Sequence, residues 1–309
     1  QEYDEAKADF QNRLEIAFAE THAAETGATP IAPDLPPVED QVGAPEVTGV
    51  PGEVIQLIGD AFVNKPEGFT VHPKLQRVLD KKSIALGIPT DYPPYGFMGP
   101  DFKPTGVDVA TAQLIADKLG VKAEFVPLST PNRIPYLQAN KIDLIVSALG
   151  KNEERAKVID FTTSYAPFFQ AVFGPKDIAV KSFDDLGGKT LAVTRGTIQD
   201  DALVQLAPKS LKIQRFEDDN ATMAAFMTQQ TQFVAVGAAV AGAALAKNPK
   251  VQAEYKLLIK DSPNYIGVRK GETALLNKVN DILRTAKQDG TLNSYSKKWL
   301  GRDMGNLPD

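Results

Sequence analysis

Over most of its length the sequence alternates short apolar stretches with amphipathic ones, and this alternation limits the choice of fold more than any other feature. Residues 83–89 (SIALGIP), 122–128 (KAEFVPL) and 143–149 (DLIVSAL) have the composition of strands. Helices are predicted over residues 107–119 and 131–139, between these strands. Strands and helices that alternate at such short spacing predict a parallel α/β sheet.

A second set of strands and helices begins after Gly174 and Pro175. Its strands are predicted at KTLAVT, KIQRF and FVAV, with helices over residues 199–206 and 220–228. The chain then returns through YIGVR to a helix over residues 272–288. Two similar lobes, with the end of the chain rejoining the first, require two crossings between the lobes.

These crossings are predicted near residues 173–176 and 264–266. Lobe 1 then comprises residues 82–174 and 265–304, lobe 2 comprises residues 175–264, and residues 305–309 form a tail. The predicted fold class is α/β, with two lobes preceded by a helical and proline-rich extension over residues 1–81.

The extension differs in character from the lobes. Residues 1–26 are acidic with a helical pattern of apolar residues, and residues 52–63 and 72–82 read as short amphipathic helices. Residues 27–52 are predicted to be an extended linker, because prolines lack the N–H groups that helices and sheets need. These prolines are Pro30, Pro33, Pro36, Pro37, Pro45 and Pro51.

Composition excludes several kinds of function. A net charge of −5 argues against nucleic acid or an anionic membrane as a partner. The absence of cysteine removes disulfides, zinc–thiolate sites and cysteine nucleophiles. Two histidines, His22 and His72, leave little for a Ser-His-Asp or histidine-rich metal site. No glycine-rich phosphate loop occurs, and no apolar run reaches the roughly 18 residues that span a bilayer.

Residues 143–165 (DLIVSALGKNEERAKVIDFTTSY) form the most informative functional run. The strand ends in small residues, which leave backbone N–H groups open to a ligand. Arg155, at the start of the next helix, can then hold a carboxylate through two parallel hydrogen bonds. An isolated arginine would more simply pair with Glu153 or Asp160, but the surrounding pattern favours the binding role.

Residues 83–304 resemble the periplasmic solute-binding proteins of polar amino-acid ABC transporters. The resemblance is carried by the motifs TDYPPYGFMG, TGVDVATAQLIADKLGV, NRIPYLQANKIDLIVSALGKNEERAKVIDFTTSY, DDLGGKTLAVTRGT, YIGVRKGE and GTLNSYSKKWLG. It implies a type II periplasmic-binding-protein fold, in which two lobes close about a hinge over a ligand. It also implies a binder without catalytic activity or cofactor.

The resemblance assigns the carboxylate clamp by position. Arg155 would hold the α-carboxylate of the ligand from lobe 1. Gly196, Thr197 and the N–H of Ile198 would complete the clamp from lobe 2, at a helix N-terminus. Thr197 can also be explained as a helix N-cap, a role that is compatible with binding.

The remaining site residues come from lobe 1. The resemblance implies that Tyr92 and Tyr95 wall the cleft and that Ser147 offers polar contacts. Asp91 would reach a ligand side chain or ammonium from the rim. A packed turn would equally explain one of the tyrosines, and an Asx turn would explain Asp91.

Two positions depart from the family pattern. Members of the family place an aspartate after the FVAV-type strand, where it pairs with the α-ammonium, but this chain has Gly237 there. A hydroxyl residue is usual at the position of Gly150. Either Asp91 or Glu217 compensates for the lost carboxylate, or the ligand is not a standard zwitterionic amino acid.

An enzyme on the same scaffold is the alternative, since some relatives with this fold are lyases of the cyclohexadienyl-dehydratase type. A cleft acid would then donate the proton, and Asp91, Glu217 or Asp218 would have to serve. No sequence feature singles out one of them.

The first 81 residues lie outside this pattern. The stretch TGVPGEVIQLIGDAFVNKPEGFTVHPKLQRVLDKK resembles part of the E1 component of actinobacterial 2-oxoglutarate dehydrogenase, without its catalytic or thiamine-binding motifs. This suggests a fusion. There are two other interpretations of residues 1–81. They are an unrelated extension, or they are a docking segment that carries the binding protein along without using it.

The expected partners are a small carboxylate-bearing ligand, with an amino acid as leading candidate, and an ABC transporter permease. A monomer is expected, and nucleic acid is not expected to bind. The resemblance implies a periplasmic or extracellular location, although the chain begins with Gln1 and no signal peptide is recognisable.

Overall fold

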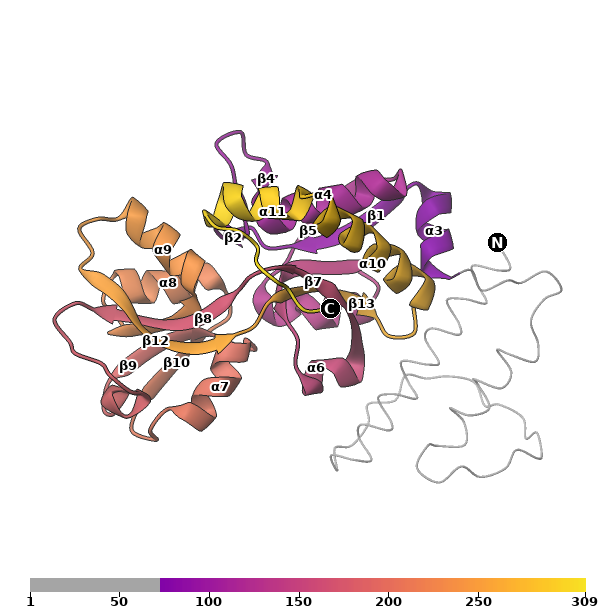
Figure 1. Ribbon diagram of the computed structural model, residues 1–309. Coiled ribbons are helices and arrows are strands. Elements are labelled where there is room, and N and C mark those ends of the chain that lie inside the picture. The colour runs from indigo at the N-terminus through magenta and orange to yellow at the C-terminus, as the bar shows by residue number, and fades with distance from the viewer. Residues whose placement is uncertain (1–72) are drawn as a thin grey trace, which may run out of the picture. The chain divides into compact units, whose positions relative to one another are not determined.

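The computed structural model describes residues 73–309. The chain divides into two compact units, Gln1–Val71 and His72–Asp309, and the described helices and strands belong to the second. The helices predicted over residues 1–26 and 52–63 and the linker over residues 27–52 lie outside the described residues. Figure 1 shows two sheets, each with its own helices, joined by strands that pass between them.

The sheet of lobe 1 has the strand order β5-β1-β6-β13-β7. Strands β5 (Lys122–Pro127) and β6 (Leu144–Gly150) run parallel to β1 (Ser83–Ile88). Strand β13 (Asn264–Arg269) is antiparallel to β6 and to β7 (Ile159–Ala166). The parallel arrangement predicted from the first three strands is confirmed, and β13 joins the sheet antiparallel to β6, entering beside Gly150.

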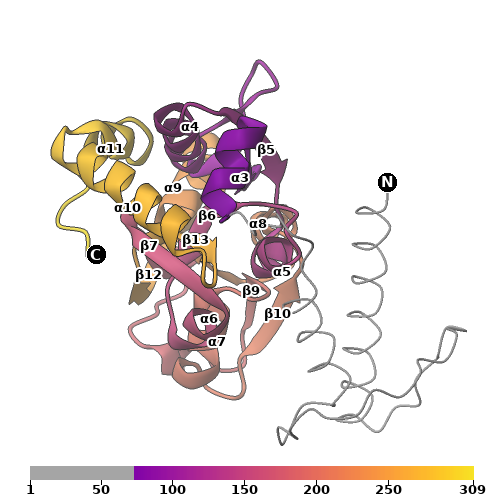
Figure 2. The ribbon, with the colours of Figure 1, turned by 90° about the vertical axis from the view of Figure 1, so that its right-hand side faces the viewer.

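Helices cover both faces of this sheet (Figure 2). Helices α4 (Val107–Leu119) and α10 (Thr273–Gln288) belong to the larger core, and Leu144 and Val146 of β6 point into it. Helix α5 (Arg133–Gln138) covers the other face, where Ile145 and Leu149 lie. Successive residues of β6 thus alternate between two buried layers, as a central strand requires. Helices α6 (Glu153–Val158) and α11 (Thr291–Tyr295) also belong to this lobe.

Lobe 2 repeats this arrangement, with the strand order β10-β9-β11-β8-β12. Strands β10 (Lys212–Phe216) and β11 (Phe233–Gly237) run parallel to β9 (Thr190–Thr194). Strand β8 (Phe169–Pro175) is antiparallel to β11 and to β12 (Ala253–Asp261). The helices of this lobe are α7 (Ile198–Leu206), α8 (Asp219–Met227) and α9 (Ala238–Lys247).

The two crossings are short and lie side by side. The first is at Pro167 and Phe168, between β7 and β8, and not near residues 173–176, because residues 169–175 already pair with strands of lobe 2. The second is at Ser262 and Pro263, next to its predicted place. The N–H of Ser262 donates to the carbonyl oxygen of Phe168 at 2.9 Å, so the crossings are hydrogen-bonded to each other.

Lobe 1 begins earlier than residue 82. Helix α3 (Lys74–Lys81), assigned above to the extension, packs against β1 and α10. Its Lys74 Nζ lies 2.9 Å from Asp143 Oδ1, and its backbone N–H donates to Glu272 at 2.9 Å. Val78 is buried in the main core. The predicted boundary at residue 81 is therefore wrong, because these contacts tie α3 to the lobe.

Two smaller features complete the unit. A small sheet of β2 (Asp91–Tyr92), β3 (Gly96–Met98) and β4 (Pro104–Thr105) lies between β1 and α4 in the chain. The predicted tail contacts lobe 1, since the N–H of Ser164 in β7 donates to the carbonyl oxygen of Pro308 at 3.3 Å. None of the helices within residues 73–309 is both long and apolar enough to cross a bilayer.

Candidate functional site

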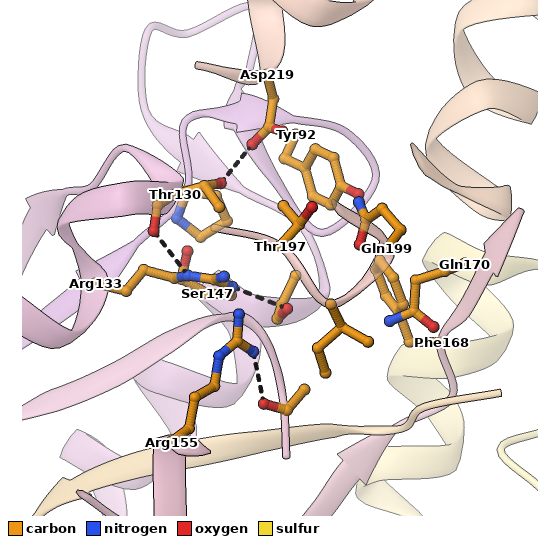
Figure 3. Close-up of a pocket in the computed structure, with 14 residues that line it drawn as sticks. Tyr92, Thr130, Arg133, Ser147, Arg155, Phe168, Gln170, Thr197, Gln199 and Asp219 are labelled. Atoms are coloured by element: carbon orange, nitrogen blue, oxygen red, sulfur yellow. Dashed lines mark hydrogen bonds between the residues drawn. The ribbon is translucent and has the colours of Figure 1, made fainter. Parts of the chain in front are cut away.

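A pocket lies between the two lobes, beside the crossings (Figure 3). The cavity in it is small, with about 20 Å³ open to the centres of water molecules. The strand ends of both sheets and the helices that follow them supply its walls, as expected for open α/β sheets. Its lining consists of Pro89, Tyr92, Thr130, Arg133, Ser147, Ala148, Gly150, Arg155, Phe168, Gln170, Thr197, Ile198, Gln199 and Asp219.

Arg155 lies in this pocket and reaches both lobes. Its Nη1 donates to the carbonyl oxygen of Gly150 at 2.7 Å, and its Nη2 donates to that of Gly196, in lobe 2, at 2.8 Å. Asn152 caps α6 by accepting the backbone N–H of Arg155 at 2.8 Å, which fixes where the side chain starts. Burial, and then the positive charge of Arg133, lower the pKa of Arg155 to about 9. A buried guanidinium that keeps its positive charge at neutral pH favours an anionic partner.

A second buried arginine, Arg133, was not predicted as a site residue. It begins α5, and its Nη1 donates to the carbonyl oxygen of Ser147 at 3.0 Å. Its Nε donates to the carbonyl oxygen of Thr130 at 3.1 Å, and burial lowers its pKa. A positive charge in the first turn opposes the helix dipole, and this was the signal in the sequence that could have marked Arg133.

The end of β6 is bent where it meets the pocket. Ala148 has φ of 42°, a left-handed conformation that costs a non-glycine residue about 1 kcal/mol. Its N–H donates to Asp108 at 2.8 Å, and its carbonyl oxygen accepts from Arg133 at 3.2 Å. One of the N–H groups expected to be open to a ligand is thus occupied. Ser147, expected to offer polar contacts, lines the pocket beside this bend.

Asp108 is fully buried behind the bend. The hydroxyl of Tyr165 donates to its other carboxylate oxygen at 2.6 Å. Burial raises the pKa of Asp108 to about 7, and the two hydrogen bonds oppose this shift. The carboxylate positions the bend from outside the pocket lining.

Lobe 2 presents the first turn of α7 to the pocket. Thr197 caps the helix, because its Oγ1 accepts the N–H of Asp200 at 3.1 Å and donates to the carbonyl oxygen of Thr194 at 2.9 Å. Thr197 and Ile198 line the pocket. Gly196 has φ of 74°, and it contacts the site through its carbonyl oxygen.

Gly150 has its own explanation in the structure. A Cβ at this position would come within 2.2 Å of Cδ1 of Ile198, which reaches across from lobe 2. The hydroxyl expected here is absent because a side chain of the opposite lobe occupies its space.

The two predicted tyrosines have different places. Tyr92 lines the pocket, and its hydroxyl oxygen accepts the N–H of Gly237 at 3.0 Å, across the lobes. Tyr95 lies outside the lining: its hydroxyl donates to the carbonyl oxygen of Pro167 at 3.0 Å, and its ring packs 5.0 Å from that of Phe168. Its position beside the crossing supports Phe168 from behind, because the turn between β2 and β3 directs it into the core.

Asp91 also lies outside the lining, and it joins the lobes. Its Oδ2 accepts the N–H groups of Asp219 and Asn220, at the start of α8, both at 3.0 Å. A carboxylate is favourable at a helix N-terminus. Burial is the main reason that its pKa is raised.

Asp219 is the one carboxylate in the pocket lining of the described chain. Thr130 donates to its Oδ2 at 2.8 Å and Thr194 donates to its Oδ1 at 2.6 Å. Burial, and then the charge of Asp91, raise its pKa to about 6. Both oxygens of this carboxylate therefore already have hydrogen-bond donors.

The other acids considered above do not line the pocket. Asp218 caps α8 by accepting the N–H of Ala221 at 2.7 Å. Glu217 is exposed and pairs with Arg195 at 2.7 Å. Within residues 73–309, no group of histidine and acidic side chains is placed to hold a metal ion.

Two similar lobes with a buried, positively charged pocket between them define a protein that binds a small solute. A family model described as bacterial extracellular solute-binding proteins, family 3, matches residues 84–302. The chain belongs to this family.

Named relatives agree with this assignment. The L-cystine-binding protein TcyJ of Escherichia coli K12 is 29% identical over 232 residues, which cover 74% of this chain and 87% of that protein. The ABC transporter glutamine-binding protein GlnH of Bacillus subtilis 168 is 30% identical over 234 residues, covering 74% and 85%. The crystal structure of a P235GK mutant of ArgBP from T. maritima matches with a TM-score of 0.69 and 30% identity, covering 74% and 99%. The predicted two-lobed fold is confirmed.

Proposed function

We propose that this protein captures an amino acid by its carboxylate, between the two lobes, and presents the closed form to the permease of an ABC transporter. The observation that carries the proposal is the placement of Arg155, a buried guanidinium in the pocket wall with donors directed to both lobes. The relatives named above for cystine and glutamine, and the arginine-bound form of ArgBP from T. maritima, support an amino acid as ligand.

Capture and closure use different groups. The ligand carboxylate meets Arg155 on lobe 1 and takes the place of the Gly196 carbonyl as a partner of its Nη2. The N–H groups of Ile198 and Gln199, in the first turn of α7, have no partner within their helix, so they can donate to the same carboxylate from lobe 2. These N–H contacts exist only when the lobes are together, and binding therefore favours closure.

The charge of the pocket suits an anion. Arg133 and Arg155 line it, with Asp219 as the opposing charge. The carboxylate of an amino acid would supply the second negative charge. The side chain of the amino acid would then extend toward Gln199 and Thr130, which offer polar contacts at the other walls.

The decisive experiment is isothermal titration of the wild-type protein with the common L-amino acids and L-cystine. We expect saturable binding of at least one of them, and expect Arg155→Ala to weaken it. An absence of binding across the panel would contradict the proposal.

Binding without turnover is proposed over the lyase alternative. The three acids considered for it cap α8 or face solvent, and Asp219 holds two threonine hydroxyls. Incubation with prephenate and with arogenate is expected to yield no aromatic product. Formation of such a product would favour the lyase.

A location outside the cytoplasm, a monomeric state and the permease as partner are proposed from the family. The resemblance of residues 1–81 to a dehydrogenase fragment stays a prediction, since all but the last part of this segment lies outside the described residues. Sedimentation analysis checks the monomeric state.

A further inference from the structure

Within the proposed function, one question about the ligand is open: what holds its amino group. The carboxylate expected at the end of β11 is replaced by Gly237. Neither Asp91 nor Glu217, the two acids considered as substitutes for it, reaches the pocket. Asp91 accepts hydrogen bonds at the start of α8, and Glu217 is exposed and pairs with Arg195. The partner must therefore be sought among the side chains that line the pocket.

Position 237 itself has no room for a side chain. A Cβ there would lie 2.5 Å from Cζ of Phe168 and 3.0 Å from the hydroxyl oxygen of Tyr92. The N–H of Gly237 donates to that same hydroxyl. The aromatic pair of Tyr92 and Phe168, with ring centroids 6.3 Å apart, thus occupies the space of the missing carboxylate.

Gln170 lies directly opposite Gly237. The two residues are partners in the antiparallel pair of β8 and β11, so their side-chain positions share one face of the sheet. In this register the two Cβ positions are about 5 Å apart, within reach of a glutamine side chain. Gln170 lines the pocket next to Phe168 (Figure 3).

The amide oxygen of Gln170 is buried and has no hydrogen-bond partner among the described residues. The whole residue is only 3% exposed. A buried acceptor without a donor costs about 1–3 kcal/mol. Because Gln170 lies in the pocket wall, a half-turn of its amide group can bring this oxygen to a donor in the pocket. Asp219, by comparison, already accepts from two threonines.

We propose that Gln170 is a specificity residue, whose amide oxygen accepts a hydrogen bond from the α-ammonium of the ligand in place of the missing carboxylate. The acceptor is neutral, so it distinguishes an ammonium from an uncharged group less strongly than a carboxylate would. Selection for the α-amine in this protein then depends on one amide.

The test compares ligands with and without the amine. The probes are L-glutamine with its deamino analogue glutaramate, and L-arginine with 5-guanidinopentanoate. Each is titrated calorimetrically against the wild-type protein, Gln170→Leu, Gln170→Glu, and Gln205→Leu as a matched control on an exposed position of α7. Thermal melts confirm that each variant is folded.

For a probe pair that binds, Gln170→Leu is expected to raise the Kd of the amine-bearing ligand about tenfold and to change that of the deamino analogue less than about twofold. Gln170→Glu is expected to tighten the amine-bearing ligand by about fivefold and to weaken its analogue, because a charged acceptor replaces a neutral one. Gln205→Leu should leave both constants unchanged.

Other outcomes overturn the proposal in recognisable ways. Equal losses for both ligands in Gln170→Leu, or a weaker amine-bearing ligand in Gln170→Glu, would mean that the amide donates or only packs. Binding of the deamino analogues alone by the wild-type protein would overturn the role of Gln170 but keep carboxylate capture. Binding of no amino acid in the wider panel would instead refute the proposed function.

Discussion

The two walls of the pocket differ in charge although the two lobes share a strand arrangement. Lobe 1 supplies both arginines of the lining, Arg133 and Arg155, and in the described chain lobe 2 supplies no cation to it. Lobe 2 instead presents the first turn of α7 and two neutral amides, Gln170 and Gln199, beside Asp219. This difference in charge shows that lobe 1 can attract an anion by itself. Lobe 2 can only add hydrogen bonds to an anion that lobe 1 already holds.

The two walls also differ in which part of a helix faces the pocket. Each lobe sends a strand into a capped helix at the pocket, β6 into α6 and β9 into α7. On lobe 1 the helix contributes a long charged side chain, and on lobe 2 it contributes backbone N–H groups. Changes on the first wall should therefore affect capture, and changes on the second should affect closure.

The largest expected effect is that of Arg155→Ala, which removes the cation from the first wall. We expect the Kd of the amino acid bound by the wild-type protein to rise between about 10-fold and 100-fold, the loss of charge-assisted hydrogen bonds. Titration calorimetry measures it. Arg195→Ala, an exposed arginine of lobe 2 that pairs with Glu217, serves as the control. An unchanged Kd in Arg155→Ala would remove this residue from the site.

The second prediction concerns the support behind the first wall. The pKa of Asp108 is about 7 in the folded protein against an ordinary value of 3.8. Between these values the folded state holds a proton that the unfolded chain has released, so the free energy of unfolding falls as the pH rises through this range. Asp108→Asn should flatten this dependence by about 3 kcal/mol between about pH 4.5 and 7.5.

Urea unfolding of both proteins at several pH values between 4.5 and 7.5 measures the difference. Asp117→Asn, an exposed position of the same helix, is the control, and it should follow the wild-type curve. Parallel curves for the wild-type protein and Asp108→Asn would show that the carboxyl group titrates normally.

The third prediction tests the contact between the walls. Gly150→Ala places a Cβ against Ile198, and we expect it to hinder closure and raise the Kd about tenfold. Adding Ile198→Ala should recover part of this loss, because it frees the space across the cleft. If the double variant binds no better than Gly150→Ala, the two residues do not meet in the bound state.

The smallest expected effect is on the second wall. Thr197→Ala removes the cap of α7 and should lower the free energy of unfolding by about 1 kcal/mol, with a rise of about threefold in the Kd. Thr197→Ser keeps the hydroxyl and should behave as the wild-type protein does. A loss in Thr197→Ala as large as that in Arg155→Ala would show that the walls do not divide capture and closure.

The sequence predicted the strand and helix pattern where periodicity and helix-ending signals are strong. The helix predicted over residues 107–119 is confirmed as α4, which ends at Gly120 in a left-handed conformation. Strand β12 was not predicted, because its sequence AEYKLLIKD carries charges along an edge of the sheet. The first crossing was placed too late in the chain, because FFQAVFGP (residues 168–175) reads as one strand that ends where the crossing was expected. Pro167 and Pro263 mark the two crossings in the sequence.

The site was only partly predictable. The structure brings Tyr92, Ser147, Arg155, Thr197 and Ile198 to one pocket, and their roles in binding stay predictions. Asp91 and Tyr95 instead join or support the lobes. Gln170 could not be found from the sequence, because only the register of β8 against β11 places it opposite Gly237.

The paired crossings constrain how the molecule can move. Each crossing is two residues long and contains a proline, whose ring fixes one backbone torsion angle. The hydrogen bond between Ser262 and Phe168 ties the two segments together, so they cannot rotate independently. Few backbone torsion angles are therefore free to change when the two lobes move from an open to a closed arrangement. Little of the free energy of ligand binding is then lost in ordering the connection between the lobes.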